Sequence, residues 1–157
     1  MSWRGSVTPQ DRVFASLPYL LPLIDVLPFG AVLFAQFPSL RLLFLPLQPL
    51  IIINSIPFAS LIIFFVLYLA VVRNENISHF IRFNTLQAIL LDIVLVLCSM
   101  LTGILLPGLG QNLLTETLLN VVFLGTLAAC VYSVVQSLLG RYAEIPALSE
   151  AVYTQVR

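Results

Sequence analysis

The chain lacks lysine entirely and is poor in every other residue type from which soluble active sites are usually built. It has one histidine and two cysteines, only 9% of its residues are charged, and its seven arginines balance seven acids. This balance gives no sign of a nucleic-acid surface. No glycine-rich phosphate loop, Ser/His/Asp or Cys/His set, or metal-ligand spacing is present, so we expect no enzyme, no cofactor and no metal site.

Apolar residues make up 60% of the chain, and its mean hydropathy is +1.06. A domain of this size cannot bury so much apolar surface away from water. The sequence therefore predicts an all-α integral membrane protein with one domain over 1–157. A helix needs about 20 apolar residues to cross a bilayer. Four predicted transmembrane helices meet this demand, over 17–37, 50–72, 80–106 and 113–139, between an interfacial segment (1–16) and a polar tail (140–157).

The arginines predict the orientation of the chain, because short basic loops stay on the cytoplasmic side. With four spans both termini share one face, and only Arg41 lies on the opposite face. The shared face would carry Arg4, Arg12, Arg73, Arg82, Arg141 and Arg157. We therefore predict that both termini are cytoplasmic, or stromal in an organelle.

Two aspartates, Asp25 and Asp92, interrupt the apolar runs and are the first candidate functional residues. A charge in hydrocarbon costs at least about 2.5–3.5 kcal/mol, so such residues usually face protein, water or a partner. Around Asp25, prolines 18, 22 and 28 remove backbone donors from the first span. This region is either a kinked, packed helix in which Asp25 bonds to an Asn or Gln, or the wall of a polar cavity.

The third span carries a polar stripe within a sector of about 140°, at about 100° per residue. Its members are Asn84, Gln87, Ala88, Asp92, Ser99 and Thr102. Arg82 projects elsewhere, and we expect it to snorkel to the interface. His79 is either a solvated residue at the helix start or a ligand of a pigment or metal, although no second ligand supports the latter.

The fourth span places small residues at every fourth position, namely Gly125, Ala129, Ser133 and Ser137. Such grooves let helices approach closely in lipid. The groove packs either against the third span or against another subunit. The apolar, proline-rich loop over 38–49 is likewise either a lipid anchor or a surface for another membrane protein.

Two stretches resemble the twenty-kilodalton subunit family of the chloroplast inner-envelope translocon (Tic). The first is Arg12-Val-Phe-Ala-Ser-Leu-Pro-Tyr-Leu-Leu-Pro-Leu23, and the second runs from His79 to Ile93. In the second, Arg82, Asn84, Gln87 and Ala88 follow the family pattern at the head of its third helix. The resemblance implies four membrane helices with stromal or cytoplasmic termini, in agreement with the arginine pattern. Because no transit peptide or secretory signal is evident, we expect the short cyanobacterial or plastid-encoded form.

The resemblance also implies a function: a translocon component that lines a channel for preproteins, with other membrane subunits and preproteins as candidate partners beside the lipid bilayer. If an aqueous path exists, we expect Asp25, Asn84, Gln87 and Asp92 to line it. Two other functions stay open, a non-conducting accessory or assembly subunit of a larger photosynthetic complex and a small transporter. The expected location is a cyanobacterial plasma or thylakoid membrane or a plastid inner envelope.

Overall fold

The structure is a computed structural model that describes residues 6–156, and within this range every regular element is helical. The α-helices are α1 (Pro9–Ser16), α2 (Leu20–Asp25), α3 (Ala31–Gln36), α4 (Gln48–Asn54), α5 (Ala59–Leu67), α6 (His79–Leu109), α7 (Leu113–Leu138) and α8 (Leu148–Gln155). Three 3₁₀ segments, η2 (Leu17–Tyr19), η3 (Leu27–Gly30) and η4 (Pro38–Leu47), and the π-helical turn η5 (Tyr68–Val72) connect them. The all-α class predicted from the sequence is confirmed.

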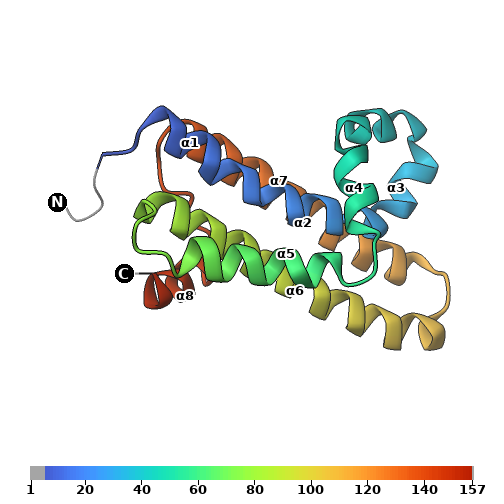
Figure 1. The fold of residues 1–157 in the computed structure, drawn as a ribbon. Coiled ribbons are helices and arrows are strands. Elements are labelled where there is room, and N and C mark those ends of the chain that lie inside the picture. Colours follow the sequence, from blue (N-terminus) through green and yellow to red (C-terminus); the bar gives the residue numbers. More distant parts are fainter. Residues whose placement is uncertain (1–5, 157) are drawn as a thin grey trace.

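Helices α6 and α7 form a long hairpin (Figure 1). Each is long and apolar enough to cross a membrane on its own. Ser78 caps the start of α6 by accepting the amide of Ile81, and Gly110 ends it with a φ of 73°, which glycine adopts without strain. Asn112 then opens α7 with a reciprocal capping box to Thr115. These caps explain why the chain reverses so sharply between the two helices.

The amino-terminal helices form a broken span. Thr8 caps α1, with Asp11 completing a capping box, and the chain continues through η2 into α2. Between Pro9–Asp25 and Leu27–Gln36 the direction changes by 52°. Pro28 stands at the beginning of η3, where its missing amide and fixed φ favour a new helical turn over continuation of α2.

The next broken span bends by 98°, between Pro38–Asn54 and Ala59–Val72. Phe58 is left-handed there, with a φ of 65°, and it interrupts the segment predicted as one helix over 50–72. In Figure 1, α4 stands across the direction in which α5 runs back along the molecule. Segment 59–72 alone is about 21 Å long, which is less than the hydrocarbon thickness of about 30 Å. The chain thus has two straight candidate spans, or four when each bent pair is one span.

One end of the molecule gathers most of the described arginines. Helix α1, the loop after η5, the start of α6 and the segment between α7 and α8 lie at this end (Figure 1). The described arginines in these segments are Arg12, Arg73, Arg82 and Arg141. We call it the arginine end. Arg41, in η4, belongs to the opposite end with the α6–α7 turn. Arg4 and Arg157 lie outside the described residues, and which side of the membrane the arginine end faces stays a prediction.

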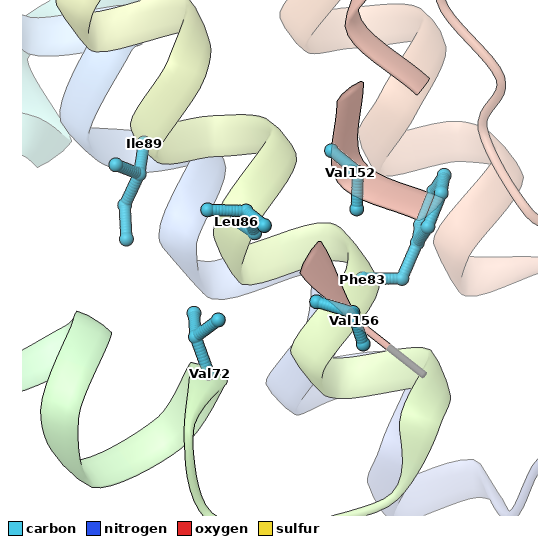
Figure 2. Close-up of a cluster of buried hydrophobic side chains, with 6 residues drawn as sticks. All are labelled: Val72, Phe83, Leu86, Ile89, Val152 and Val156. Atoms are coloured by element: carbon cyan, nitrogen blue, oxygen red, sulfur yellow. The ribbon is translucent and has the colours of Figure 1, made fainter. Parts of the chain in front are cut away.

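The tail after α7 folds back and completes a core at the arginine end. Figure 2 shows Val152 and Val156 meeting Phe83, Leu86 and Val72, with Ile89 one turn further along α6. Val152 and Val156 are 0% and 1% exposed. The tail is therefore packed into the helical domain.

Candidate functional site

The first polar cluster links the amino-terminal helices to α6 and α7 at the arginine end. The Tyr19 hydroxyl donates to Asn84 Oδ1 over 2.8 Å and accepts from Gln87 Nε2 over 2.9 Å. Ser137 of α7 also donates to Asn84 Oδ1, over 3.1 Å. All four side chains are 0% exposed. We call Tyr19, Asn84, Gln87 and Ser137 the hub.

The two amides of the hub donate three hydrogen bonds within the chain, although Gln87 Oε1 is buried without a partner among residues 6–156. Asn84 Nδ2 donates to the carbonyl of Phe80 over 2.9 Å, and Gln87 Nε2 donates to the carbonyl of Ala143 over 2.6 Å in addition to Tyr19. Buried polar groups normally need such partners, and in lipid no water replaces them. The hub therefore holds η2, α6, α7 and the tail together, and its amides face protein on all sides.

The second polar cluster lies deeper and contains the two intramembrane aspartates. Asp92 lies about 20 Å along α6 from His79, at 1.5 Å per residue, and so near the middle of the span. The carboxyl groups of Asp92 and Asp25 interact electrostatically with each other. Asn54, the last residue of α4, donates its Nδ2 to Asp25 Oδ1 over 2.6 Å. We call Asp25, Asn54 and Asp92 the carboxylate cluster; it brings together α2, α4 and α6.

The carboxylate cluster, unlike the hub, is partly open. All three side chains are half-buried. Asp92 Oδ1 and Asn54 Oδ1 are buried atoms with no hydrogen-bond partner among residues 6–156. Asp25 lines a crevice of about 430 Å³, whose other polar side chains are Ser60, Ser99 and Thr102. This crevice continues the polar stripe of α6 beyond Asp92.

The stripe predicted on α6 thus divides into two environments. Asn84 and Gln87 belong to the closed hub, whereas Asp92, Ser99 and Thr102 belong to the carboxylate cluster and its crevice. Of the four residues predicted to line a path, the structure brings Asp25 and Asp92 together and places the two amides elsewhere. Tyr19 was not predicted from the sequence as part of a polar cluster. The sequence feature that could have indicated Tyr19 is a phenolic hydroxyl inside an apolar run, beside a proline.

Arg82 does not snorkel, so that expectation is wrong. Its side chain is only 8% exposed and its Nε donates to the carbonyl of Val72 over 2.8 Å. Val72 ends the π-helical turn η5, whose last carbonyls have no partner within their own helix. Arg82 therefore fastens the end of the second broken span to α6.

The predicted small-residue groove of α7 packs against other helices along only part of its length. Ser133 and Ser137 are buried, and Ala129 packs against the core cluster that contains Tyr19 and Ala88. Gly125 is exposed, and a Cβ atom there would meet nothing within 4 Å. The contact thus fades toward the α6–α7 turn.

His79 is engaged in protein contacts at the arginine end. Its Nδ1 lies 2.9 Å from the Tyr142 hydroxyl and its Nε2 lies 3.2 Å from the Val156 carbonyl. Within the part of the chain that the structure describes, no three His, Cys, Asp or Glu side chains gather as a metal site would require. The geometry therefore assigns His79 to holding the tail on α6.

Comparison with known proteins shows which family the chain resembles. Residues 8–152 match the sequence model of a family described as "Chloroplast import apparatus Tic20-like". A Tic20 family protein of Synechocystis is 52% identical, covering 100% of this chain and 99% of that protein. The Arabidopsis thaliana protein TIC 20-II, chloroplastic, is 40% identical over 99% of this chain and 78% of its own length. A Tic20 family protein Ycf60 of Gracilaria tenuistipitata is 35% identical over 97% and 78%.

Proposed function

The chain belongs to the Tic20 family, and from this premise we propose that it is a membrane-embedded component of a protein translocon, with a transport path that passes the carboxylate cluster. The description of the family names a chloroplast import apparatus, and the relatives come from cyanobacteria, red algae and a plant. The proposed location is accordingly a cyanobacterial membrane or the plastid inner envelope, and the proposed cargo is a preprotein.

The observation that carries this proposal is the pair Asp25 and Asp92 at mid-depth beside an open polar crevice. Intramembrane carboxylates are expensive, and they commonly mark paths for polar or charged species. Hydroxyl groups of Ser60, Ser99 and Thr102 extend the polarity of the crevice beyond the carboxylates. Water in such a crevice would let polar backbone pass without facing hydrocarbon.

The hub supports the same proposal by fixing the position of α6. Tyr19 lies six residues before Asp25, and Gln87 lies five before Asp92. The hydrogen bond between Tyr19 and Gln87 therefore sets the register between the first span and α6 close to the carboxylates. In this proposal the amides position the path, and the carboxylates and hydroxyls line it.

The open side of the crevice leads us to expect a partner protein in the membrane. Ser99 is exposed, and neighbouring Val96 is 55% exposed, so residues 6–156 cover only one side of this region. Lipid is a poor neighbour for a carboxylate and would not complete an aqueous path. We therefore include in the proposal that another membrane subunit, or a second copy of this chain, closes the crevice.

Reconstitution in planar bilayers tests the proposal. If the carboxylates line the path, Asp25→Asn and Asp92→Asn each lower the preference for cations, measured as a shift of the reversal potential in a salt gradient. Glu150→Gln is the matched control, because Glu150 is an exposed carboxylate in α8, away from the crevice. Selectivity unchanged in both aspartate variants would exclude the cluster from the path.

A non-conducting accessory subunit is the second candidate, and the closed hub favours it. Buried amides that hydrogen-bond to other segments of the chain act as interhelical glue, as a scaffold requires. For an accessory subunit, Asp25→Asn and Asp92→Asn would reduce recovery of partner subunits in affinity capture from native membranes. The reconstituted wild type would show no conductance. Capture of preproteins together with translocon subunits would favour the path instead.

A further inference from the structure

A second groove, on the other side of the first span, separates α1 and α2 from α5. Its volume is about 640 Å³, and one wall includes Leu17, Leu21 and Ile24 while the other includes Ile63 and Leu67. Its only polar lining residues are Asn54 and Thr85, and no charged side chain lines it. We call it the α2–α5 groove. Pockets of about 300–1,000 Å³ are the usual size for small ligands.

The groove has the length of one lipid leaflet. On its first wall it runs from Phe14 to Ile24, which is about 15 Å at the helical rise of 1.5 Å per residue. Half of a hydrocarbon core of about 30 Å is also about 15 Å. Ile77 and Val71 line it near the arginine end, and Asn54 lines it near the carboxylate cluster. The groove therefore follows the leaflet on the arginine side from its surface to mid-depth.

The walls of the groove favour a slender chain over a helix. Transmembrane helices approach one another closely where small residues line the contact. Among residues 6–156 no glycine, alanine or serine lines the groove, and large side chains such as Leu17, Leu21 and Leu67 line it instead. An unbranched apolar chain adapts to such walls without a seam of small residues.

The groove is continuous with the lipid-facing surface of the protein. At its lip Phe14, Leu17 and Ile53 are 57%, 48% and 49% exposed, and adjoining Ile62 and Val13 are 60% and 51% exposed. An apolar groove that opens sideways into a bilayer costs free energy if it stays empty or fills with water, because its lining atoms then lack apolar neighbours. We propose that one acyl chain of a membrane glycerolipid occupies the α2–α5 groove.

The lipid chain acts as a spacer that completes the packing of α5. Helix α5 is held to α6 mainly at its end, through Val72 and the hydrogen bond from Arg82. Along its length the acyl chain supplies the contacts that α1 and α2 do not. Asn54 lines the groove and also donates to Asp25, so the bound chain borders the carboxylate cluster.

Native mass spectrometry tests this proposal. The full chain is incorporated in vesicles of palmitoyl-oleoyl phosphatidylglycerol and phosphatidylcholine, extracted in a mild detergent, and depleted stepwise of lipid. We expect the wild type to retain one glycerolipid after loosely bound lipid is gone. Ile63→Trp, which puts an indole into the groove, reduces the retained population by about tenfold, the size of effect that overpacking produces.

The matched control is Ile62→Trp on the same helix, since Ile62 is 60% exposed and does not line the groove. It retains lipid like the wild type. Leu21→Trp fills the groove from the opposite wall, and we expect the same loss of lipid from it. It replaces Ile63→Trp in the test if that variant lowers helicity in circular dichroism. A wild-type protein that releases all its lipid with the bulk, or groove variants that keep one lipid while remaining helical, would overturn the proposal.

Discussion

Two single substitutions in the hub remove the same number of hydrogen bonds and should differ clearly in their effect on stability. Tyr19→Phe removes the bond donated to Asn84 and the bond accepted from Gln87. Gln87→Leu removes the bonds donated to Tyr19 and to the Ala143 carbonyl. Each change keeps the size of the side chain nearly constant, so packing contributes little to the difference.

The expected difference comes from the partners that are left behind. After Tyr19→Phe, Asn84 Oδ1 keeps the Ser137 hydroxyl and Gln87 Nε2 keeps the Ala143 carbonyl. Each of these two atoms keeps at least one partner, but one N–H of Gln87 loses its acceptor, and we expect a loss of about 1–2 kcal/mol in the free energy of unfolding. After Gln87→Leu, the Ala143 carbonyl, in a residue that is 0% exposed, has no other donor among residues 6–156. We then expect a loss of about 2–4 kcal/mol, a lost bond plus a desolvated carbonyl.

Cys130 supplies a local assay for this prediction. It is a free thiol in α7, it is 1% exposed, and its helix also carries Ser137 of the hub. In a Cys98→Ser background, the rate of maleimide labelling reports how often the contact with the first span opens. The midpoints of the two expected losses differ by about 1.5 kcal/mol, and a change of about 1.4 kcal/mol is tenfold, so Gln87→Leu should label about tenfold faster than Tyr19→Phe. Equal rates, or a faster Tyr19→Phe, would refute the orphan argument.

Two further predictions concern packing and orientation. Gly30→Ala should destabilise the protein by about 1–3 kcal/mol in reversible unfolding in mixed micelles, because the new Cβ atom would lie 2.7 Å from a ring carbon of Phe123. Gly125→Ala is its control and should be neutral or stabilise by up to about 1 kcal/mol, since nothing lies within 4 Å; equal losses would contradict this account. For orientation, Arg73→Cys and Arg41→Cys should react with an impermeant maleimide from opposite faces of sealed vesicles, and labelling from one face would refute the topology.

The fold class and the depth of the carboxylates follow from the sequence for a simple reason. In a bilayer, length and apolarity decide what is a span, and 80–106 and 113–139 satisfy both without a break. The rarity of charge in these runs also singles out Asp92 before any contact is known. Such inferences use only the properties of one helix and its solvent.

The contacts between helices cannot be predicted from the properties of one helix. The 3.6-residue period puts Asn84, Gln87 and Asp92 on one face of α6, but it does not say what covers that face at each level. Tyr19 and the Ala143 carbonyl cover its first part, and both come from distant segments with irregular backbone. The left-handed conformation of Phe58 is equally hard to predict, because a residue with a Cβ atom gives no local signal for that conformation.

The bend in the first span explains why one half of α6 is closed and the other half is open. Up to Asp25 the amino-terminal helices pack on α6, as Tyr19 and Asp25 show by their partners. After the bend of 52° the chain stays on α7, where Phe29 and Phe34 share a cluster with Phe123 that reaches α6 at Leu95. From about Leu95 onward α6 therefore loses its cover from the first span, at the level where the crevice begins. Changes on the arginine-end half of α6 should then alter stability, whereas changes at Ser99 should alter assembly with whatever closes the crevice.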